Sequence, residues 1–470
     1  MHAAGVARPD ARRVAPLNIP VPLTSVCRTR IVSRCRLRGT RMTLAARFAC
    51  FLAALFFLPG AHAQSVTIRA GKVIDVEAGR VLADQAIRIE RGHIVSIGAY
   101  RDAKHDSTQL VDWSAFTVLP GLMDMHTHLV GDIQSADDTA PFKSSAARDA
   151  LIGAEHARVT LQAGFTTVRD VGVYRAFTDV ALRDAINAGW IPGPRMYVAG
   201  AYLTITNGGG TVGVVPAGMT VPDEMRVGIA DNEQQVREKV RTILKGGADF
   251  IKIIATGAVL TAGTEPGAPE YSEAQMRAAV EEATKLGSYA IAHAHGADGI
   301  KFAVRAGVRS IEHGSYLDAE GIRLMKEHGT WLDADVYNGD YIDEVGKRDG
   351  WSQEILRKNR ETTDVQRAGF AAAVKAGVRI SFGTDSGVYP HGTNARQFAY
   401  MVKNGQTPMQ AIQAATINSA QLLRQEKNLG SIAPGKWADI VAVKGDPLAD
   451  IRVLEHVAAV MKGGEIVKSP

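Results

Sequence analysis

Cysteine is scarce in this 470-residue chain, and its placement is uneven. The three cysteines, Cys27, Cys35 and Cys50, all precede residue 64. A chain that begins at Gln64 therefore needs no disulfide, and it offers neither a cysteine nucleophile nor a thiolate metal ligand. The absence of cysteine from such a chain is compatible with a periplasmic or secreted protein.

The chain also lacks an apolar run long enough to make a good membrane span. The short apolar stretch Phe48–Leu58 follows Arg47 and precedes the small-residue site Ala61-His62-Ala63. This pattern is typical of a secretory signal peptide over residues 42–63, cleaved after Ala63. We therefore expect a periplasmic or secreted protein.

The excess of positive charge is confined to the part before Gln64. Residues 1–41 hold nine arginines and one acid, and Arg47 adds one cation, so residues 64–470 carry a net charge of −4 although the whole chain carries +5. We interpret residues 1–41 as an over-extended leader ahead of Met42; a genuine basic tail is the alternative. For the mature form we expect a small-molecule substrate and a homo-oligomer, with no nucleic-acid or membrane partner.

Two end segments, residues 64–118 and 429–470, alternate apolar and polar residues as half-buried antiparallel strands do. Neither segment has enough strands for a stable sandwich of its own. We therefore predict that the two segments together form one small composite β-sandwich domain.

Residues 119–428 alternate strands with helices. One predicted helix, "SEAQMRAAVEEATKLG", has Ser272 as its N-cap and Gly287 as its C-cap. An open doubly wound sheet would alternate in the same way, but no G-x-G-x-x-G follows the first strand. The pattern therefore favours an α/β fold, a (β/α)8 TIM barrel. Its predicted strands are 121–129, 165–173, 195–205, 250–257, 289–296, 310–315, 331–337 and 379–387.

Polar residues gather at the strand ends where such a barrel carries its chemistry. Each has an ordinary structural explanation by itself: Asp385 could cap the next helix, and Lys252 could pair with a neighbouring acid. Together they offer imidazole, carboxylate and amine from five strands, a donor set that suits Zn²⁺ and related metals. The set comprises His126, His128, Lys252, His293, His295, His313 and Asp385.

Several motifs resemble those of the amidohydrolase superfamily, in its binuclear form with a bridging lysine. They are "LPGLMDMHTHL", "TTVRDVG", "FIKI", "AHAHG", "IEHGS", "GTDSG", "PHGTN" and "GSIAPGKWADIVAV", and the resemblance spans roughly residues 66–470. The chain looks most like the branch with imidazolonepropionase-like enzymes, Xaa-Pro and Xaa-Arg/Lys dipeptidases, and amidohydrolases that cleave ochratoxin A.

The resemblance implies two divalent metal ions, with zinc the expected metal. It places Asp385 with His126 and His128 at the more buried metal, and His293 with His313 at the second. Spacing leaves His293 and His295 facing the same way, so it cannot decide between them. The choice of His293 rests on the family motif.

The resemblance also implies that Lys252 is carboxylated by CO₂ and bridges the two metals. Burial lowers the pKa of a lysine and so supplies the neutral amine that adds CO₂. Two cations then stabilise the anionic carbamate.

The implied chemistry is hydrolysis of an amide, with a metal-activated water as nucleophile and Asp385 as general base and then general acid. Serine hydrolysis lacks its G-x-S-x-G motif in the barrel. A metal-dependent deaminase typically has a glutamate just beyond strand five, where "HAHGADG" has none. A non-catalytic metal-binding protein would be favoured by a missing ligand, and none is missing.

Specificity is expected from the loops after the strands. The glycine-rich loop 204–219 is long enough to be a lid or is only a flexible turn, and 263–273 is a second candidate wall. Asn207, Tyr337 and His391 are candidate substrate contacts. The leading substrate class is a dipeptide or N-acyl amino acid, possibly ochratoxin A; the alternative is a cyclic amide, as for imidazolonepropionase or hydantoinase.

Overall fold

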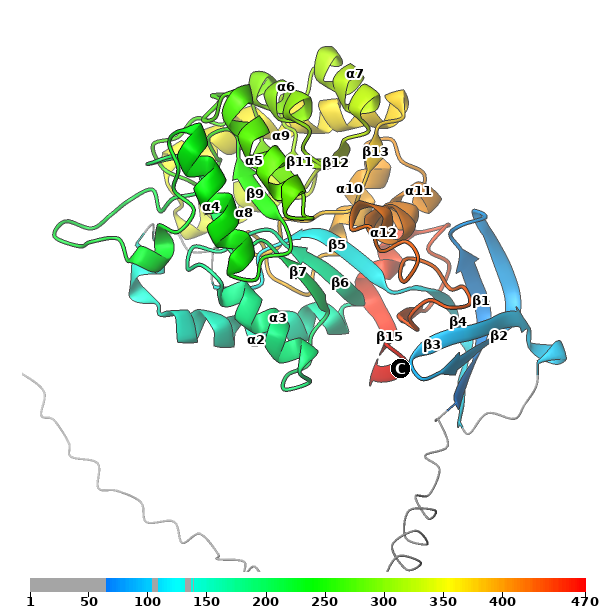
Figure 1. Ribbon diagram of the computed structural model, residues 1–470. Coiled ribbons are helices and arrows are strands. Elements are labelled where there is room, and N and C mark those ends of the chain that lie inside the picture. The colour runs from blue at the N-terminus through cyan, green and yellow to red at the C-terminus, as the bar shows by residue number, and fades with distance from the viewer. Residues whose placement is uncertain (1–64, 104–108, 132–136, 138) are drawn as a thin grey trace, which may run out of the picture. The chain divides into compact units, whose positions relative to one another are not determined.

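The computed structural model describes residues 65–103, 109–131, 137 and 139–470 (Figure 1). The predicted leader 1–41 and signal peptide 42–63 lie outside the described residues. None of the helices within those ranges is both long and apolar enough to cross a bilayer.

The predicted TIM barrel is confirmed. Its strands are parallel and form two hydrogen-bonded runs, β5-β6-β7 and β8 to β13. Hydrogen bonds from Asp249 N to Val198 O (2.8 Å) and from Met125 N to Phe382 O (2.7 Å) join the runs. The strands are β5 (Leu122–Thr127), β6 (Phe165–Asp170), β7 (Arg195–Val198), β8 (Tyr202–Leu203), β9 (Ile251–Ile254), β10 (Ala290–Ala294), β11 (Ser310–His313), β12 (Trp331–Asp333) and β13 (Arg379–Ile380).

The third predicted strand, 195–205, is divided into β7 and β8. Gly200, between them, has a φ of +71°, and its N–H donates to the buried carboxylate of Asp179 (2.8 Å). A left-handed residue interrupts the strand, so the chain bends between its two halves.

Helices follow the strands and lie outside them (Figure 1). The predicted start of α5 is confirmed, because Ser272 and Gln275 form a capping box. The helix ends at Lys285, so its C-cap is Leu286 and not the predicted Gly287. Gly287 follows the cap at a φ of +77°. The helices are α2 (Ala146–Gln162), α3 (Thr178–Asn187), α4 (Glu233–Lys245), α5 (Glu273–Lys285), α6 (Ala297–Ala306), α7 (Ala319–His328), α8 (Asn338–Asp349), α9 (Gln353–Ala376), α10 (Arg396–Lys403), α11 (Pro408–Gln413) and α12 (Ser419–Leu422).

The two end segments pair as predicted, in one seven-stranded sheet ordered β16-β15-β14-β4-β1-β2-β3. Antiparallel pairing of β4 with β14 joins them, with Pro120 opposite Ile440. The strands are β1 (Ser65–Asp75), β2 (Arg80–Glu90), β3 (His93–Ala99), β4 (Gln109–Pro120), β14 (Ile440–Val443), β15 (Val457–Lys462) and β16 (Glu465–Lys468).

Side chains alternate between the two faces of this sheet. Ile440 and Ala442 belong to a core of the β-domain itself, whereas Val441 and Val443 pack into the barrel core. Ala438 N donates to Gly92 O (2.8 Å), so the turn before β3 meets the segment before β14 and the sheet curls over its own core.

Candidate metal centre

The structure brings all of the predicted metal ligands into one cavity at the carboxyl ends of the barrel strands. Backbone hydrogen bonds from Asp385 N to His126 O and from His128 N to Ser386 O, both 2.8 Å, hold the segment after β13 against β5. The buried residues that meet there are His126, His128, Lys252, His293, His295, His313 and Asp385.

Two of these residues have unusual backbone conformations. His313 has a φ of +68° and Asp385 a φ of +56°, and neither is a glycine. Left-handed backbone costs such residues on the order of 1 kcal/mol and persists where the surroundings fix it, which is most often at functional sites. The strain indicates that side-chain placement at these two positions is under strong constraint.

A first cluster consists of His126, His128 and Asp385. Asp385 Oδ1 lies 3.4 Å from His126 Nε2 and 3.2 Å from His128 Nε2. His128 Nδ1 lies 2.9 Å from Gly172 O, to which it donates in the tautomer that leaves Nε2 free as a ligand. Burial alone would raise the pKa of Asp385, but the two histidines hold it well below its ordinary value.

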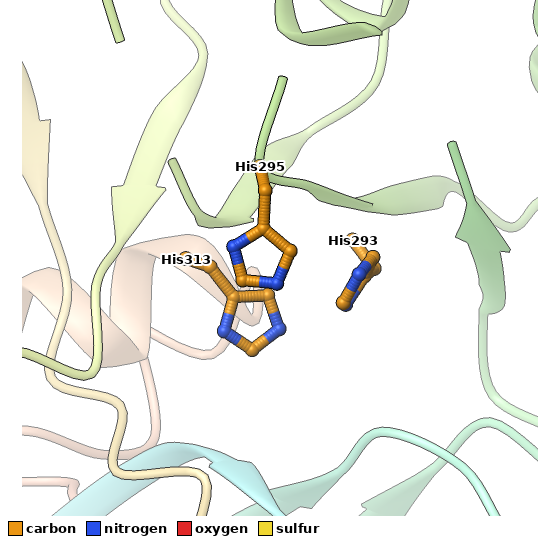
Figure 2. A group of neighbouring side chains, drawn as sticks. All are labelled: His293, His295 and His313. Carbon is orange, nitrogen blue, oxygen red and sulfur yellow. The ribbon is translucent and has the colours of Figure 1, made fainter. Parts of the chain in front are cut away.

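A second cluster consists of His293, His295 and His313 (Figure 2). The rings of His295 and His313 stack with centroids 4.7 Å apart, and the ring of His293 stands nearly perpendicular to that of His295. Burial lowers the pKa of His293 and of His295 well below 6.5, so both imidazoles are neutral, as metal ligands must be. The cluster accommodates either His293 or His295, so the choice of His293 stays a prediction.

Lys252 on β9 lies in the same cavity, with 1 % of its surface exposed. Its Nζ has no hydrogen-bond partner among the described residues. Burial lowers the pKa of Lys252 to about 8, against the opposing charge of Glu312. An unpartnered buried amine of this acidity, between imidazole and carboxylate donors, fits a pair of divalent metal ions and a lysine carbamate.

The sequence analysis missed a buried ion-pair chain behind the first cluster. Arg169 on β6 donates from Nη2 to Glu312 Oε2 on β11 (2.8 Å), and the same oxygen lies 3.2 Å from His126 Nδ1. Arg169 and His126 lower the pKa of Glu312 in spite of its burial. A carboxylate at Nδ1 leaves Nε2 of His126 as the ligand atom.

A second missed group links the two clusters. Asn338 Nδ2 donates to Asp385 Oδ2 (3.0 Å) and to Asp335 Oδ2 (3.1 Å). Asp335 Oδ1 in turn lies 3.0 Å from His313 Nδ1 and accepts a hydrogen bond from Gln366 Nε2 (2.8 Å). Asn338 therefore fixes the orientation of the Asp385 carboxylate relative to the second cluster.

We expect Asn338→Ala to lower kcat about 10- to 100-fold with little change in metal content, because supporting residues of this kind act through the ligands they orient. Steady-state kinetics and metal analysis would measure both. Asn404→Ala is the matched control, since the Asn404 side chain donates to Tyr400 O on α10 and to no other described residue. Equal kinetics of the two variants would contradict the orienting role.

The three predicted substrate contacts do not line the cavity. Asn207 is exposed, at a φ of +59°. Tyr337 is buried among other groups, with its hydroxyl accepting from Arg396 Nη1 (3.0 Å). His391 Nε2 lies 3.1 Å from His128 O, behind the first cluster.

Two loops do form cavity walls. The predicted lid contributes its glycine-rich part through Gly209, Gly210 and Gly213, and the segment 258–262 contributes a wall in place of the predicted 263–273. Gly209 N donates to Glu270 Oε1 (2.8 Å), which holds the glycine loop down. Burial raises the pKa of Glu270 to about 7.

We expect Glu270→Gln to change the pH dependence of stability. The pKa of Glu270 is about 7 in the folded protein, against an ordinary 4.5. The contribution of protonated Glu270 to the free energy of unfolding is therefore fully present below pH 4.5 and is lost as the pH rises through about 7. Glutamine keeps the acceptor for Gly209 and removes that loss, so the variant should gain about 1–3 kcal/mol over the parent between pH 5 and 8. Urea unfolding at several pH values measures it, with the exposed Glu281→Gln as control; parallel curves would refute the assignment.

Comparisons with known proteins agree with this geometry. A family model described as "Amidohydrolase family" matches residues 117–467. The chain is 34 % identical to an ochratoxinase of Aspergillus niger over 432 residues, which cover 87 % of this chain and 88 % of that protein.

Solved structures are similar as well. A Xaa-Pro dipeptidase with methionine bound in its active site superposes with a TM-score of 0.80 at 40 % identity, covering 86 % of this chain and 99 % of that one. A prolidase in complex with N-methylphosphonate-L-proline superposes with a TM-score of 0.77 at 28 % identity, covering 86 % and 100 %.

Proposed function

This chain belongs to the amidohydrolase family, and we propose that it hydrolyses the amide bond of a dipeptide or N-acyl amino acid. In such a substrate the amine side of the bond carries a free carboxylate. One observation carries the proposal: two clusters of imidazole and carboxylate donors share a cavity with an unpartnered buried lysine. The similarity to an ochratoxinase and to dipeptidases supports an amide of this kind, ochratoxin A among them.

In this proposal His126, His128 and Asp385 would hold one divalent metal, and His293 and His313 would hold the second. Lys252, as a carbamate, would supply an anionic ligand to both. Zinc is the proposed metal, because it takes imidazole and carboxylate ligands. When bound, the metal would lower the pKa of a water molecule and polarise the amide carbonyl.

The chain's own residues handle the proton. Asp385 accepts a proton from the attacking water at its carboxylate and returns it to the leaving nitrogen. Asn338 holds Asp385 Oδ2, so that Oδ1 faces His126 and His128. Glu312 fixes His126 from behind, and Arg169 neutralises the charge of Glu312.

The test is a screen of purified Gln64–Pro470 protein, with metal analysis, against dipeptides, N-acyl amino acids and ochratoxin A. We expect about two metals per chain and cleavage of at least one carboxylate-bearing amide. One metal per chain together with deamination would overturn the proposal.

We also propose that the protein is exported by the signal peptide 42–63 into the periplasm or medium. N-terminal sequencing of the exported protein should read from Gln64. A mature protein that begins within residues 1–41 would contradict both the cleavage site and the interpretation of the leader.

A further inference from the structure

Part of the cavity wall is apolar. Five of its lining residues pack with one another as a single cluster, which we term the apolar subsite: Leu260, Ile342, Trp351, Ile355 and Val388. Four of them are buried, whereas Leu260 on the 258–262 loop is only partly buried. None of the reaction steps proposed above uses these residues.

The apolar subsite adjoins the catalytic carboxylate. Ile342 follows Asn338 by one turn of α8, so the two side chains share a helix face, and both line the cavity. Val388 lies three residues after Asp385, and its N–H donates to Asp385 O (3.1 Å). A substrate group that lies beside Asp385 and Asn338 is therefore only about 5 Å, one turn of helix, from apolar side chains.

Helix α9 shows how the lining changes along the cavity. Ile355, Asn359, Thr362 and Gln366 lie along one stripe of the helix, and all four line the cavity. Gln366 bonds Asp335 beside the second cluster, whereas Ile355, eleven residues earlier, belongs to the apolar subsite. The stripe spans about 16 Å and runs from the metal-ligand end to an apolar end.

Specific polar contacts hold the loop wall of this subsite in place. Lys358 is fully buried on α9, and its Nζ donates to Thr261 O (2.7 Å) and pairs with Glu354 (2.7 Å). Glu354 also accepts from Gly263 N (2.9 Å), and Thr261 Oγ1 donates to Gly209 O (2.7 Å). A buried charged lysine needs such partners, so the loop that carries Leu260 is fixed to α9 on one side and to the glycine loop on the other.

The apolar subsite itself offers no charged partner to an occupant. Lys252 is the single lysine or arginine among the described residues that line the cavity, and it lies with the ligand clusters. A carboxylate or ammonium placed among Leu260, Trp351 and Ile355 would lose its water without gaining a partner.

On the basis of the proposed amide hydrolysis, we propose that the apolar subsite receives a large uncharged side group of the substrate, aromatic or branched aliphatic, on one side of the scissile bond. Leu260 is then a specificity-determining residue.

Two substrate series on the metal-loaded Gln64–Pro470 protein test this. One series keeps the acyl group and varies the amine among alanine, leucine, phenylalanine, aspartate and lysine; the other keeps the amine and varies the acyl group in the same way. In one series kcat/KM should rise at least about tenfold from alanine to leucine or phenylalanine, since a buried apolar group contributes on this scale. A preference for charged groups, or no preference in either series, overturns the proposal.

Two variants locate the preference. Leu260→Ala should lower kcat/KM at least about tenfold for the large apolar group and less than about threefold for alanine. Leu286→Ala is the matched control, because Leu286 is 51 % exposed at the end of α5. Leu260→Asp, on a partly buried loop residue, should reverse the preference between phenylalanine and lysine.

Equal losses for all side groups in both Leu260 variants would refute the assignment while leaving amide hydrolysis intact. If the parent protein cleaves nothing in either series, the proposed function fails instead, so the two failures are distinguishable.

Discussion

Asp385→Asn should nearly abolish turnover, with kcat falling about 10²–10⁴-fold, while most of the metal stays bound. Asparagine keeps an oxygen near His126 Nε2 and His128 Nε2 but cannot accept the proton of the attacking water. The pKa of Asp385 lies well below its ordinary value, so the parent carboxylate is ionised at neutral pH and ready to act as base.

Kinetics and metal analysis on the same preparation separate the base from the ligand role. Asp184→Asn is the matched control, because Asp184 lies exposed on α3 and Arg183 is its one ion-pair partner within the described ranges. Full activity with full metal content in Asp385→Asn would remove Asp385 from proton transfer, whereas loss of metal would make it chiefly a ligand.

Lys252→Ala should lower the metal content from about two per chain towards one and reduce kcat about 100-fold or more. The substitution removes the proposed bridging anion between the clusters and shortens a side chain that lines the cavity. Added acetate or propionate should restore part of the metal and of the activity, because a short carboxylate fits the vacated space.

Lys462→Ala provides the matched control for that experiment. Burial lowers the pKa of Lys462 to about 8, as for Lys252, but Lys462 lies on β15 and donates to Gly193 O away from the cavity. It should lose stability and keep its metal. If Lys252→Ala keeps both metals and full activity, the bridging role is wrong.

Much of this site could be predicted because its residues break a local pattern. A lysine within "FIKI" and two histidines within "HTH" stand out in apolar strands. Arg169 and Glu312 stand in equally buried strands, but their pairing joins positions 143 residues apart, and only the closed barrel brings them together. The signal for them was the same unexplained charge in a buried strand.

The lining of the cavity could not be predicted, because it depends on helix phase and loop placement. Tyr337 was favoured for its place after strand seven, but α8 begins one residue later, and it is Asn338 that lines the cavity. Trp351 and Ile355 lie together around the start of α9, but Leu260 comes from a distant loop that no local pattern relates to them. The division of the third strand likewise depends on a hydrogen bond from Gly200 to the distant Asp179.

The pairing of β4 with β14 also constrains the order of folding. Pro120 and Ile440 are opposite each other across that pair although nearly the whole barrel separates them in sequence. Such long-range pairing is slow to form, and the β-domain cannot close until its last strands are available. A chain on which β14 is not yet available therefore has an unfinished sheet, with β4 unpaired on one side. Completion of the β-domain is thus a late event in folding, because it waits for strands that follow the barrel in the chain.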